Sequence, residues 1–359
     1  MPQTDVLPLA AWQDLRTVMV KNPSPSDLDL ARLFVGEREM KSIQSFTHLR
    51  AALEFLFEHL ELPERTVLFP RYICGSVVRA AKRAGLAVRF CDVDQKTGAL
   101  SFEALKMQAT HKIGAVFLVH AFGIAAEIEE ISKYCKEHKI FLIEDCAHVL
   151  NADEREKPLG TYGDFALFHF AKKIPNVHGG LLISYKKVLP ELEKRVRPKL
   201  KELISLALKW DLLRPAVNLL RTTTPPPEDQ DEAADKSHFK MKSASRGSKR
   251  LLQKQIKKYV AGAKHRKSLQ HEYLRELPST FEALCKEPNG DLFHFPVLVP
   301  ENMKRDEILK KLRVYGVFAD RLWYKSDDIF ADRILQLPLS ERMKEKDVHF
   351  ISKLLQHVE

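Results

Sequence analysis

The chain has 359 residues, 45% of them hydrophobic and 30% charged. This is the composition of an ordinary globular protein, and the length favours one large domain and one smaller one over a single core. Its net charge of +10 does not by itself indicate a nucleic-acid partner, because much of the excess lies in residues 236–267, a segment without an acidic residue. No apolar run reaches the ~18 to 20 residues of a membrane span, and residues 1–16 carry acids where a signal peptide would be basic. We therefore expect a cytoplasmic protein without stable membrane insertion.

From residue 47 onward, helical and strand-like segments alternate. The spacing of apolar residues predicts helices over 47–60, 74–85, 102–109 and 124–139. Short apolar runs predict strands over 65–70, 87–94, 113–123, 140–148, 164–171 and 179–185. Strands that are apolar throughout and separated by helices indicate an α/β fold with a mostly parallel sheet, covered by helices on both faces.

The C-terminal part predicts a second, smaller α/β unit, with a strand over 291–299 and helices over 305–316 and 345–358. We divide the chain into an N-terminal segment (1–46), a large domain (47–221), a flexible acidic and proline-rich loop (222–237) and a small C-terminal domain with a connecting helix (238–359). Residues 187–221 are typical of amphipathic helices that pack rather than bind a membrane. The basic stretch offers either a solvated helix face or a contact for a polyanion or phosphorylated substrate.

The five cysteines are odd in number and form no CxxC pair. Most of them lie in apolar segments, which indicates a reducing compartment without disulfides and argues against a zinc site.

Several polar residues follow the predicted strands directly. Because ligands bind at the carboxyl ends of the strands in a parallel sheet, we expect these residues to meet at one edge. They are Tyr72, Cys74, His120, Asp145, His148, Lys172 and Lys173.

A carboxylate and an amine at one edge suit several chemistries, of which the sequence disfavours three. No strand-to-helix turn carries the GxGxxG of dinucleotide enzymes, and both the GxxxxGK[ST] phosphate loop and the GxSxG serine elbow are absent. Schiff-base chemistry remains. Pyridoxal phosphate needs a lysine, an acid against its ring nitrogen and donors for its phosphate, and Lys172 and Asp145 could supply the first two.

The residues themselves strengthen this hypothesis. "FLIEDCAHVL" at 141–150 and "GTYGDFALFHFAKKIPNVHGGLLIS" at 160–184 resemble the DegT/StrS family of sugar aminotransferases, and so, upstream, does "VLFPRYICGSVVRAAKRAGLAVRFCDVD" at 67–94. The match is good over roughly residues 47–185 and weaker elsewhere, including "RDEILKKLRVYG" at 305–316. The resemblance implies the fold type I of PLP transferases, pyridoxal 5'-phosphate as cofactor, and a homodimer with its sites at the interface.

Site residues follow from the resemblance one by one. It assigns Asp145 to the pyridine nitrogen of the cofactor, and His148 to a place beside the phenolic oxygen, although a histidine at a helix start with a backbone partner is the alternative. Counting back seven residues from Gly179 places Lys172 on the family's imine-forming lysine. Lys173 is then expected to be its solvated neighbour.

The sequence departs from the family pattern around the phosphate and the ring. His169 replaces a phosphate-binding serine, and Arg50 replaces a hydroxyl residue at the start of the first helix, so binding there would use charge and helix N–H groups. Cys74 replaces the aromatic residue that often stacks on the cofactor ring, unless Tyr72 takes that role. His178 stands where an acid usually precedes the glycine pair. "HFKM" dimly resembles a partner-subunit phosphate motif, which would involve His238 and Lys240.

The resemblance implies a divergent aminotransferase that moves an amino group from an amino acid, with glutamate expected, to a nucleotide-linked keto sugar in cell-surface polysaccharide or related sugar biosynthesis. Arg321 or residues 236–267 would meet the diphosphate. One alternative is another PLP-dependent sugar modification such as dehydration. Relatives of that kind carry histidine at the lysine position, which Lys172 argues against. The other alternative is a catalytically drifted protein that acts as a binding or regulatory module.

Overall fold

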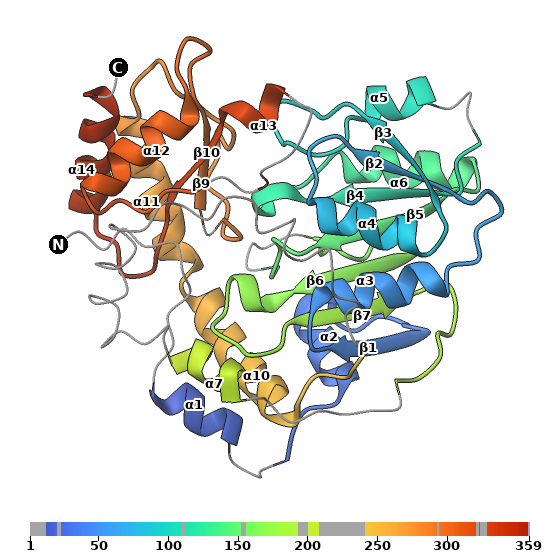
Figure 1. The fold of residues 1–359 in the computed structure, drawn as a ribbon. Helices are drawn as coiled ribbons and strands as arrows, with labels where there is room; N and C mark the ends of the chain where they lie inside the picture. Colours follow the sequence, from blue (N-terminus) through green and yellow to red (C-terminus); the bar gives the residue numbers. More distant parts are fainter. Residues whose placement is uncertain are drawn as a thin grey trace.

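The computed structural model describes residues 12–19, 23–108, 112–151, 156–192, 200–207, 241–292, 294–320, 323 and 329–357. Within these ranges the chain forms a large sheet covered by helices and a smaller unit built around a second sheet (Figure 1). No helix in the described part is long and apolar enough to cross a membrane.

Seven strands form the large sheet, in the order β1-β7-β6-β5-β4-β2-β3. Their bounds are β1 Ser42–Phe46, β2 Thr66–Pro70, β3 Ala87–Cys91, β4 Ala115–Val119, β5 Phe141–Cys146, β6 Phe165–His169 and β7 Gly180–Ser184. Strands β2 to β6 pair in parallel, while β7 is antiparallel to both β6 and β1. The prediction of a mostly parallel sheet is confirmed.

Helices cover both faces of this sheet, as the uniformly apolar strands predict. One face packs against α3 (Leu49–Glu58) and α4 (Gly75–Arg83), and the other packs against α2 (Asp27–Val35), α6 (Ile128–Glu137) and α10 (Arg246–Ala261). Alternation along β5 divides its side chains, so that Ile143 lies in the first core and Leu142 in the second. Asp145 therefore lies on the α3 side of the sheet, and Glu144 on the α2 side.

The smaller unit follows α11 (Ala263–Glu276) and contains a three-stranded antiparallel sheet of β8 (Glu282–Ala283), β9 (His294–Leu298) and β10 (Ile334–Pro338). Three further helices complete it: α12 Arg305–Val314, α13 Ile329–Arg333 and α14 Glu345–Gln356. The expected strand and both expected helices are present, and Gly316, at φ +75°, follows the end of α12. Strands β8 and β10 were not predicted.

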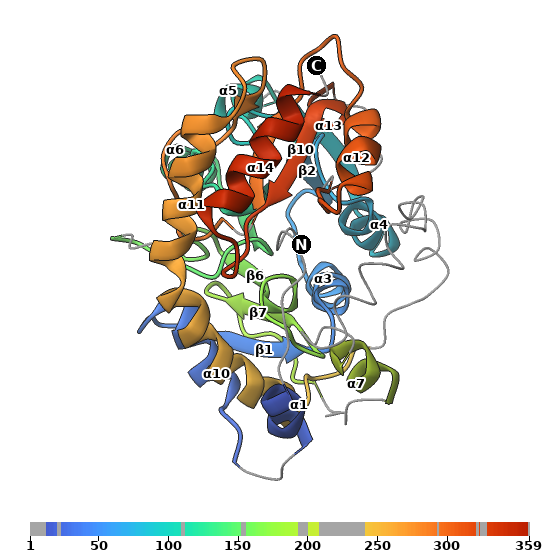
Figure 2. The ribbon, with the colours of Figure 1, turned by 90° about the vertical axis from the view of Figure 1, so that its left-hand side faces the viewer.

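The N-terminal segment takes part in the large unit. Strand β1 forms an edge of the large sheet, while α1 (Trp12–Met19) packs on α10, which Figure 2 shows side by side. The described part of the basic stretch, residues 241–267, contains α10 and the start of α11, so it connects the two units as expected. Helices α5 (Phe102–Met107) and α7 (Leu200–Ala207) are short, and most of 187–221 and all of 222–237 lie outside the described residues. The four-part domain division remains a proposal, with the sheet reaching back to Ser42.

Candidate active site

Two adjacent parallel strands bring the candidate lysine and carboxylate to the same sheet edge. Asp145 lies near the end of β5, opposite Leu167 of β6. After β6 the chain makes a 3-10 turn over Phe170–Lys172, and the Lys172 amine Nζ then lies 2.9 Å from Nε2 of His148. The structure therefore brings together three of the residues that the sequence selects.

The hydrogen bonds of His148 fix its tautomer. The backbone N–H of Phe122 donates to Nδ1 of His148 over 3.1 Å, so the proton of the neutral ring must be on Nε2. Burial lowers the pKa of His148 well below its ordinary value, with further lowering from Lys172 and Lys173, so the ring is neutral. Nε2–H then donates to Nζ of Lys172, which must offer a lone pair.

The surroundings of Lys172 therefore favour its uncharged amine. Burial lowers its pKa, and Arg50 lowers it further, while Asp145 and Cys74 act in the opposite direction. The side chain as a whole is only partly buried. An uncharged amine is the nucleophilic form of lysine.

Asp145 is a buried carboxylate with spare acceptor capacity. It is 4% exposed and accepts a hydrogen bond from the backbone N–H of Ala147 over 2.9 Å. Burial raises its pKa, against opposing contributions from Lys172, the Ala147 N–H and His120. A cationic N–H placed against this carboxylate would relieve the cost of its burial.

The other expected binding residues surround this centre at different depths. Arg50 lies in the first turn of α3 and His169 ends β6, both partly buried. Cys74 precedes α4, where its Sγ lies 3.0 Å from the hydroxyl of Ser76. Arg50 and Cys74 both act on the charge of Lys172, and His169 acts on that of His148, so all three are neighbours of the site.

Tyr72 is fully buried within an aromatic cluster. Its ring centroid lies 4.4 Å from that of Trp323 and 5.0 Å from that of Phe330, while Phe122 stacks at 6.0 Å. Its hydroxyl has no hydrogen-bond partner among the described residues, although the atom is buried. Trp323 also stacks on His148 at 5.8 Å, a neighbour that sequence analysis missed, because only the tertiary fold brings residue 323 to this edge.

Lys173 is not the solvated neighbour that the sequence predicts. It is 6% exposed, its amine donates to the backbone oxygen of Asp291, and it lies 3.8 Å from a carboxylate oxygen of Asp291 and 5.6 Å from the ring centre of Tyr259. Burial lowers the pKa of Lys173 to about 7, although Asp291 opposes the shift. The prediction was wrong because the partners of Lys173 lie more than 80 residues further along the chain.

His120, Glu144 and Cys146 form the one group in the described part of the chain whose side chains approach metal-ligand geometry. Glu144 already accepts the backbone N–H groups of Gly160, Tyr162 and Gly163 at 2.6–2.8 Å, and His120 Nε2 lies 3.2 Å from it. Nδ1 of His120 accepts from the N–H of Ala126. These bonds occupy the potential ligand atoms of His120 and Glu144, so we interpret the cluster as structural.

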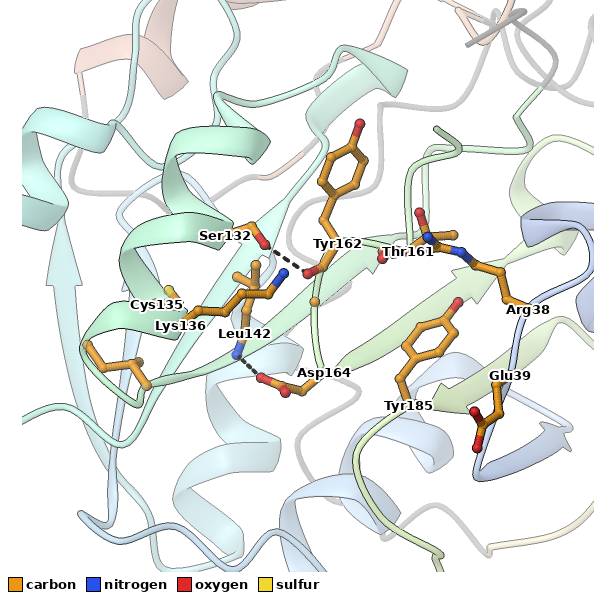
Figure 3. A pocket seen from close by; sticks show the side chains of 12 residues that line it. Arg38, Glu39, Ser132, Cys135, Lys136, Leu142, Thr161, Tyr162, Asp164 and Tyr185 are labelled. Carbon is orange, nitrogen blue, oxygen red and sulfur yellow. Dashed lines mark hydrogen bonds between the residues drawn. The ribbon is translucent and has the colours of Figure 1, made fainter. Parts of the chain in front are cut away.

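A pocket of about 250 Å³ lies at the opposite end of β5 and β6, lined by residues that include Arg38, Ser132 and Asp164 (Figure 3). Its polar groups bond to one another: Ser132 donates to the Tyr162 carbonyl over 2.9 Å, and the Leu142 N–H donates to Asp164 over 3.0 Å. Arg38 donates to the Thr161 carbonyl over 2.7 Å. This pocket is remote from Lys172, and we assign it no part in the site.

The remaining candidates stand further away or cannot be placed. Nδ1 of His178 accepts the N–H of Ser245, the residue that caps α10, over 3.0 Å. Arg321, His238 and Lys240 lie outside the described residues.

Comparisons with known proteins bear on this geometry. The model of the DegT/DnrJ/EryC1/StrS aminotransferase family matches residues 31–348. GDP-perosamine synthase of Vibrio cholerae is 28% identical over 146 residues, 40% of this chain and 39% of that protein. UDP-4-amino-4,6-dideoxy-N-acetyl-beta-L-altrosamine transaminase of Campylobacter jejuni is 29% identical over 168 residues, 46% of this chain and 44% of that protein. The chain thus matches less than half the length of these relatives.

Solved structures resemble this fold over nearly its whole length. The Helicobacter pylori aminotransferase PseC, involved in the biosynthesis of pseudoaminic acid, superposes with a TM-score of 0.71 at 17% identity, covering 98% of this chain and 97% of that one. The E. coli GDP-4-keto-6-deoxy-D-mannose-3-dehydratase with bound hydrated PLP gives 0.69 at 15% identity, covering 97% and 99%. These likenesses show the fold.

Proposed function

Because the chain belongs to the DegT/DnrJ/EryC1/StrS aminotransferase family, whose members depend on pyridoxal 5'-phosphate, we propose that it is a sugar aminotransferase. It would move an amino group from an amino acid, with glutamate expected, to a keto sugar linked to a nucleotide. Two relatives carry the names of nucleotide-linked amino sugars, which supports this substrate class. The observation that carries the proposal is the position of the Lys172 amine, 2.9 Å from Nε2 of His148 at the edge where Asp145 lies.

The residues present fit pyridoxal phosphate. When bound, this cofactor supplies an aldehyde that takes up an amine and a protonated aromatic ring that withdraws electrons from a neighbouring bond. Lys172 offers an uncharged amine for the aldehyde, and Asp145 offers a buried carboxylate for the ring N–H. Arg50 and the N-terminal turn of α3 offer positive charge and N–H groups for the phosphate.

The chain's own groups then have separate tasks. The Lys172 amine takes the proton from the α-carbon of the amino donor, and in the second half of the reaction it gives a proton to the sugar carbon that receives nitrogen. His148 holds this amine in its basic form through Nε2–H. Asp145 places its buried carboxylate next to the site where a cation is needed.

We also propose a cytoplasmic homodimer. In such a dimer, residues of the partner subunit would complete the phosphate site, where this chain has His169 and Arg50 in place of hydroxyl residues.

The test uses the purified protein incubated with pyridoxal phosphate. We expect visible Schiff-base absorbance, and formation of 2-oxoglutarate from glutamate when nucleotide keto sugars are supplied. Lys172→Ala should abolish both, while Lys112→Ala, at a side chain that is 85% exposed, should change neither. Absence of absorbance in the unsubstituted protein would contradict the proposal and favour a binding module.

A further inference from the structure

One loop of the smaller unit, residues 289–291, is inserted beside the candidate site through buried polar contacts. Asn289 and Asp291 are 6% and 0% exposed. Helix α11 holds the loop in place: Gln270 exchanges two hydrogen bonds of 2.8 Å with the backbone of Asn289, and Arg266 donates two to the Gly290 carbonyl. The loop is therefore a rigid part of the smaller unit.

The loop in turn contacts two turns next to His148, one at Gly123 and one at Leu150. These turns determine the position of the His148 ring and its tautomer. Asn289 Nδ2 donates to the Gly123 carbonyl over 2.9 Å, and the Asp291 carboxylate accepts the N–H of Leu150 over 2.9 Å. A Cβ on Gly123 would lie 2.8 Å from the His148 carbonyl oxygen and 3.0 Å from that of Asp291. The three segments are thus in direct contact.

The turn that Asn289 holds is strained. Phe122 has φ +60°, a conformation that a side chain with a Cβ rarely adopts unless its surroundings enforce it. In this conformation the Phe122 N–H donates to His148 Nδ1. The contact of Asn289 with the next residue is one of the restraints that keep this N–H in place.

Lys173 joins the loop from the other side. Its buried amine donates to the Asp291 backbone oxygen, which also accepts the Tyr259 hydroxyl over 3.1 Å. Because Lys173 follows Lys172 directly, this anchor also limits where the Lys172 backbone can lie.

We infer that the 289–291 loop is a positioning element, which keeps His148 in the tautomer that donates to Lys172 and thereby keeps the Lys172 amine uncharged. Asn289 and Lys173 are its positioning residues, and neither touches the reacting atoms. If the loop is loosened, the Phe122 N–H leaves Nδ1 and the ring takes the other tautomer. Nε2 then accepts a hydrogen bond from a Lys172 that keeps its proton. The groups that face Lys172 are Asp145 from β5, Cys74 at the start of α4, Arg50 from α3 and His148.

The inference rests on the proposed function only where it gives the Lys172 amine a catalytic role. Its test needs no cofactor. The full chain, freed of cofactor, is labelled with a trace of acetic anhydride at pH values from 6 to 11, and the extent of labelling of each lysine is read by peptide mass spectrometry. Lys112 is the exposed reference within the same molecule. We expect Lys172 to reach half of its maximal labelling at a lower pH than Lys112.

Asn289→Ser removes the donor to Gly123 without changing charge, and should raise the Lys172 midpoint by about one unit, so that labelling at pH 8 falls about tenfold. Lys173→Met is the second variant, and should act in the same direction. The matched control is Ser132→Ala, which removes another buried donor to a carbonyl at the opposite end of the sheet and should leave the midpoint unchanged.

Equal midpoints for Lys172 and Lys112, or an unchanged Lys172 midpoint in both variants, would overturn the inference. Circular dichroism confirms that each variant is folded, and if Asn289→Ser does not fold, Lys173→Met decides. If the midpoints shift as expected while the protein shows no visible absorbance with pyridoxal phosphate, the inference stands and the proposed function fails.

Discussion

Two buried carboxylates stand next to each other on β5 and face opposite sides of the sheet. Glu144, on the α2 side, accepts three backbone N–H groups of the 160–163 turn and a hydrogen bond from His120. Asp145, on the α3 side, accepts a single hydrogen bond within the described residues, from Ala147. The first carboxylate is saturated by the fold, while the second keeps acceptor capacity and a raised pKa.

The number of hydrogen-bond donors distinguishes a carboxylate that stabilises the fold from one that is available to a ligand. A buried carboxylate with four donors stabilises the turn it holds, because its charge is compensated locally. A buried carboxylate with one donor costs free energy that a ligand can recover. The same division applies to the two lysines, since Lys172 approaches His148 near Asp145, whereas Lys173 lies among Asp291 and Tyr259, near α10.

Asp145→Asn tests the functional side and should have the largest effect. The amide cannot hold a proton on the ring nitrogen of the cofactor, so we expect turnover to fall about 10³-fold, equivalent to about 4 kcal/mol. The free energy of unfolding should not fall, because a buried charge is removed. Steady-state kinetics and urea unfolding measure the two quantities. Turnover within threefold of the original protein would contradict the functional role assigned to Asp145.

Glu144→Gln tests the structural side. The amide nitrogen replaces one acceptor oxygen and faces N–H donors, so we expect the free energy of unfolding to fall by about 3 kcal/mol. Urea unfolding measures it. Because the residue does not contact the reacting atoms, turnover per folded molecule should stay within a few-fold. A stable variant with abolished turnover would place Glu144 in the site and remove the distinction.

Sequence patterns predict the strands that end at this edge of the sheet. They do not predict which polar residues of these strands are structural and which belong to the candidate site. Apolar runs identify β2, β4, β5 and β6, and the rule for parallel sheets places Asp145, His148 and Lys172 at the carboxyl ends of β5 and β6. The family resemblance then distinguishes Lys172 from Lys173. The spacing of apolar residues depends only on neighbours in the sequence, and these strands follow the expected spacing.

The environment of Lys173 could not be predicted in this way. Its partner Asp291 is 118 residues away, and Trp323 reaches Tyr72 from still further along the chain. Strand β10 contains a glutamine and ends in proline, and β8 has two residues, so neither gives a clear strand pattern. Contacts that depend on the docking of the two units leave no local signal.

The pH dependence of stability sharpens the comparison of the two lysines. Burial lowers the pKa of Lys173 from 10.5 to about 7, so between these values the unfolded chain binds a proton that the folded chain lacks. Stability should therefore rise with pH in this window, by at most about 1.4 kcal/mol per unit, and this contribution should be constant below about pH 7.

The measurement is the difference in unfolding free energy between the original protein and Lys173→Met, at pH 6 to 9. We expect the original protein to gain relative to the variant as pH rises above 7. Parallel curves would show that Lys173 remains charged when buried.

Tyr72→Phe should have the smallest effect and the opposite sign to most core substitutions. The Tyr72 hydroxyl is buried without a hydrogen-bond partner among the described residues, so its removal should raise the free energy of unfolding by about 1 kcal/mol in the absence of cofactor. Tyr273→Phe is the matched control, because that buried hydroxyl donates to the Pro338 carbonyl over 2.8 Å, and its loss should lower stability by about 1 kcal/mol. We expect a ligand bound at this edge to offer the Tyr72 hydroxyl a hydrogen-bond partner. The gain of Tyr72→Phe should therefore shrink or reverse when pyridoxal phosphate and substrate are present. Urea unfolding with and without these ligands measures the effect, and a loss for Tyr72→Phe as large as that for Tyr273→Phe would mean that the Tyr72 hydroxyl is as well satisfied as the structural groups.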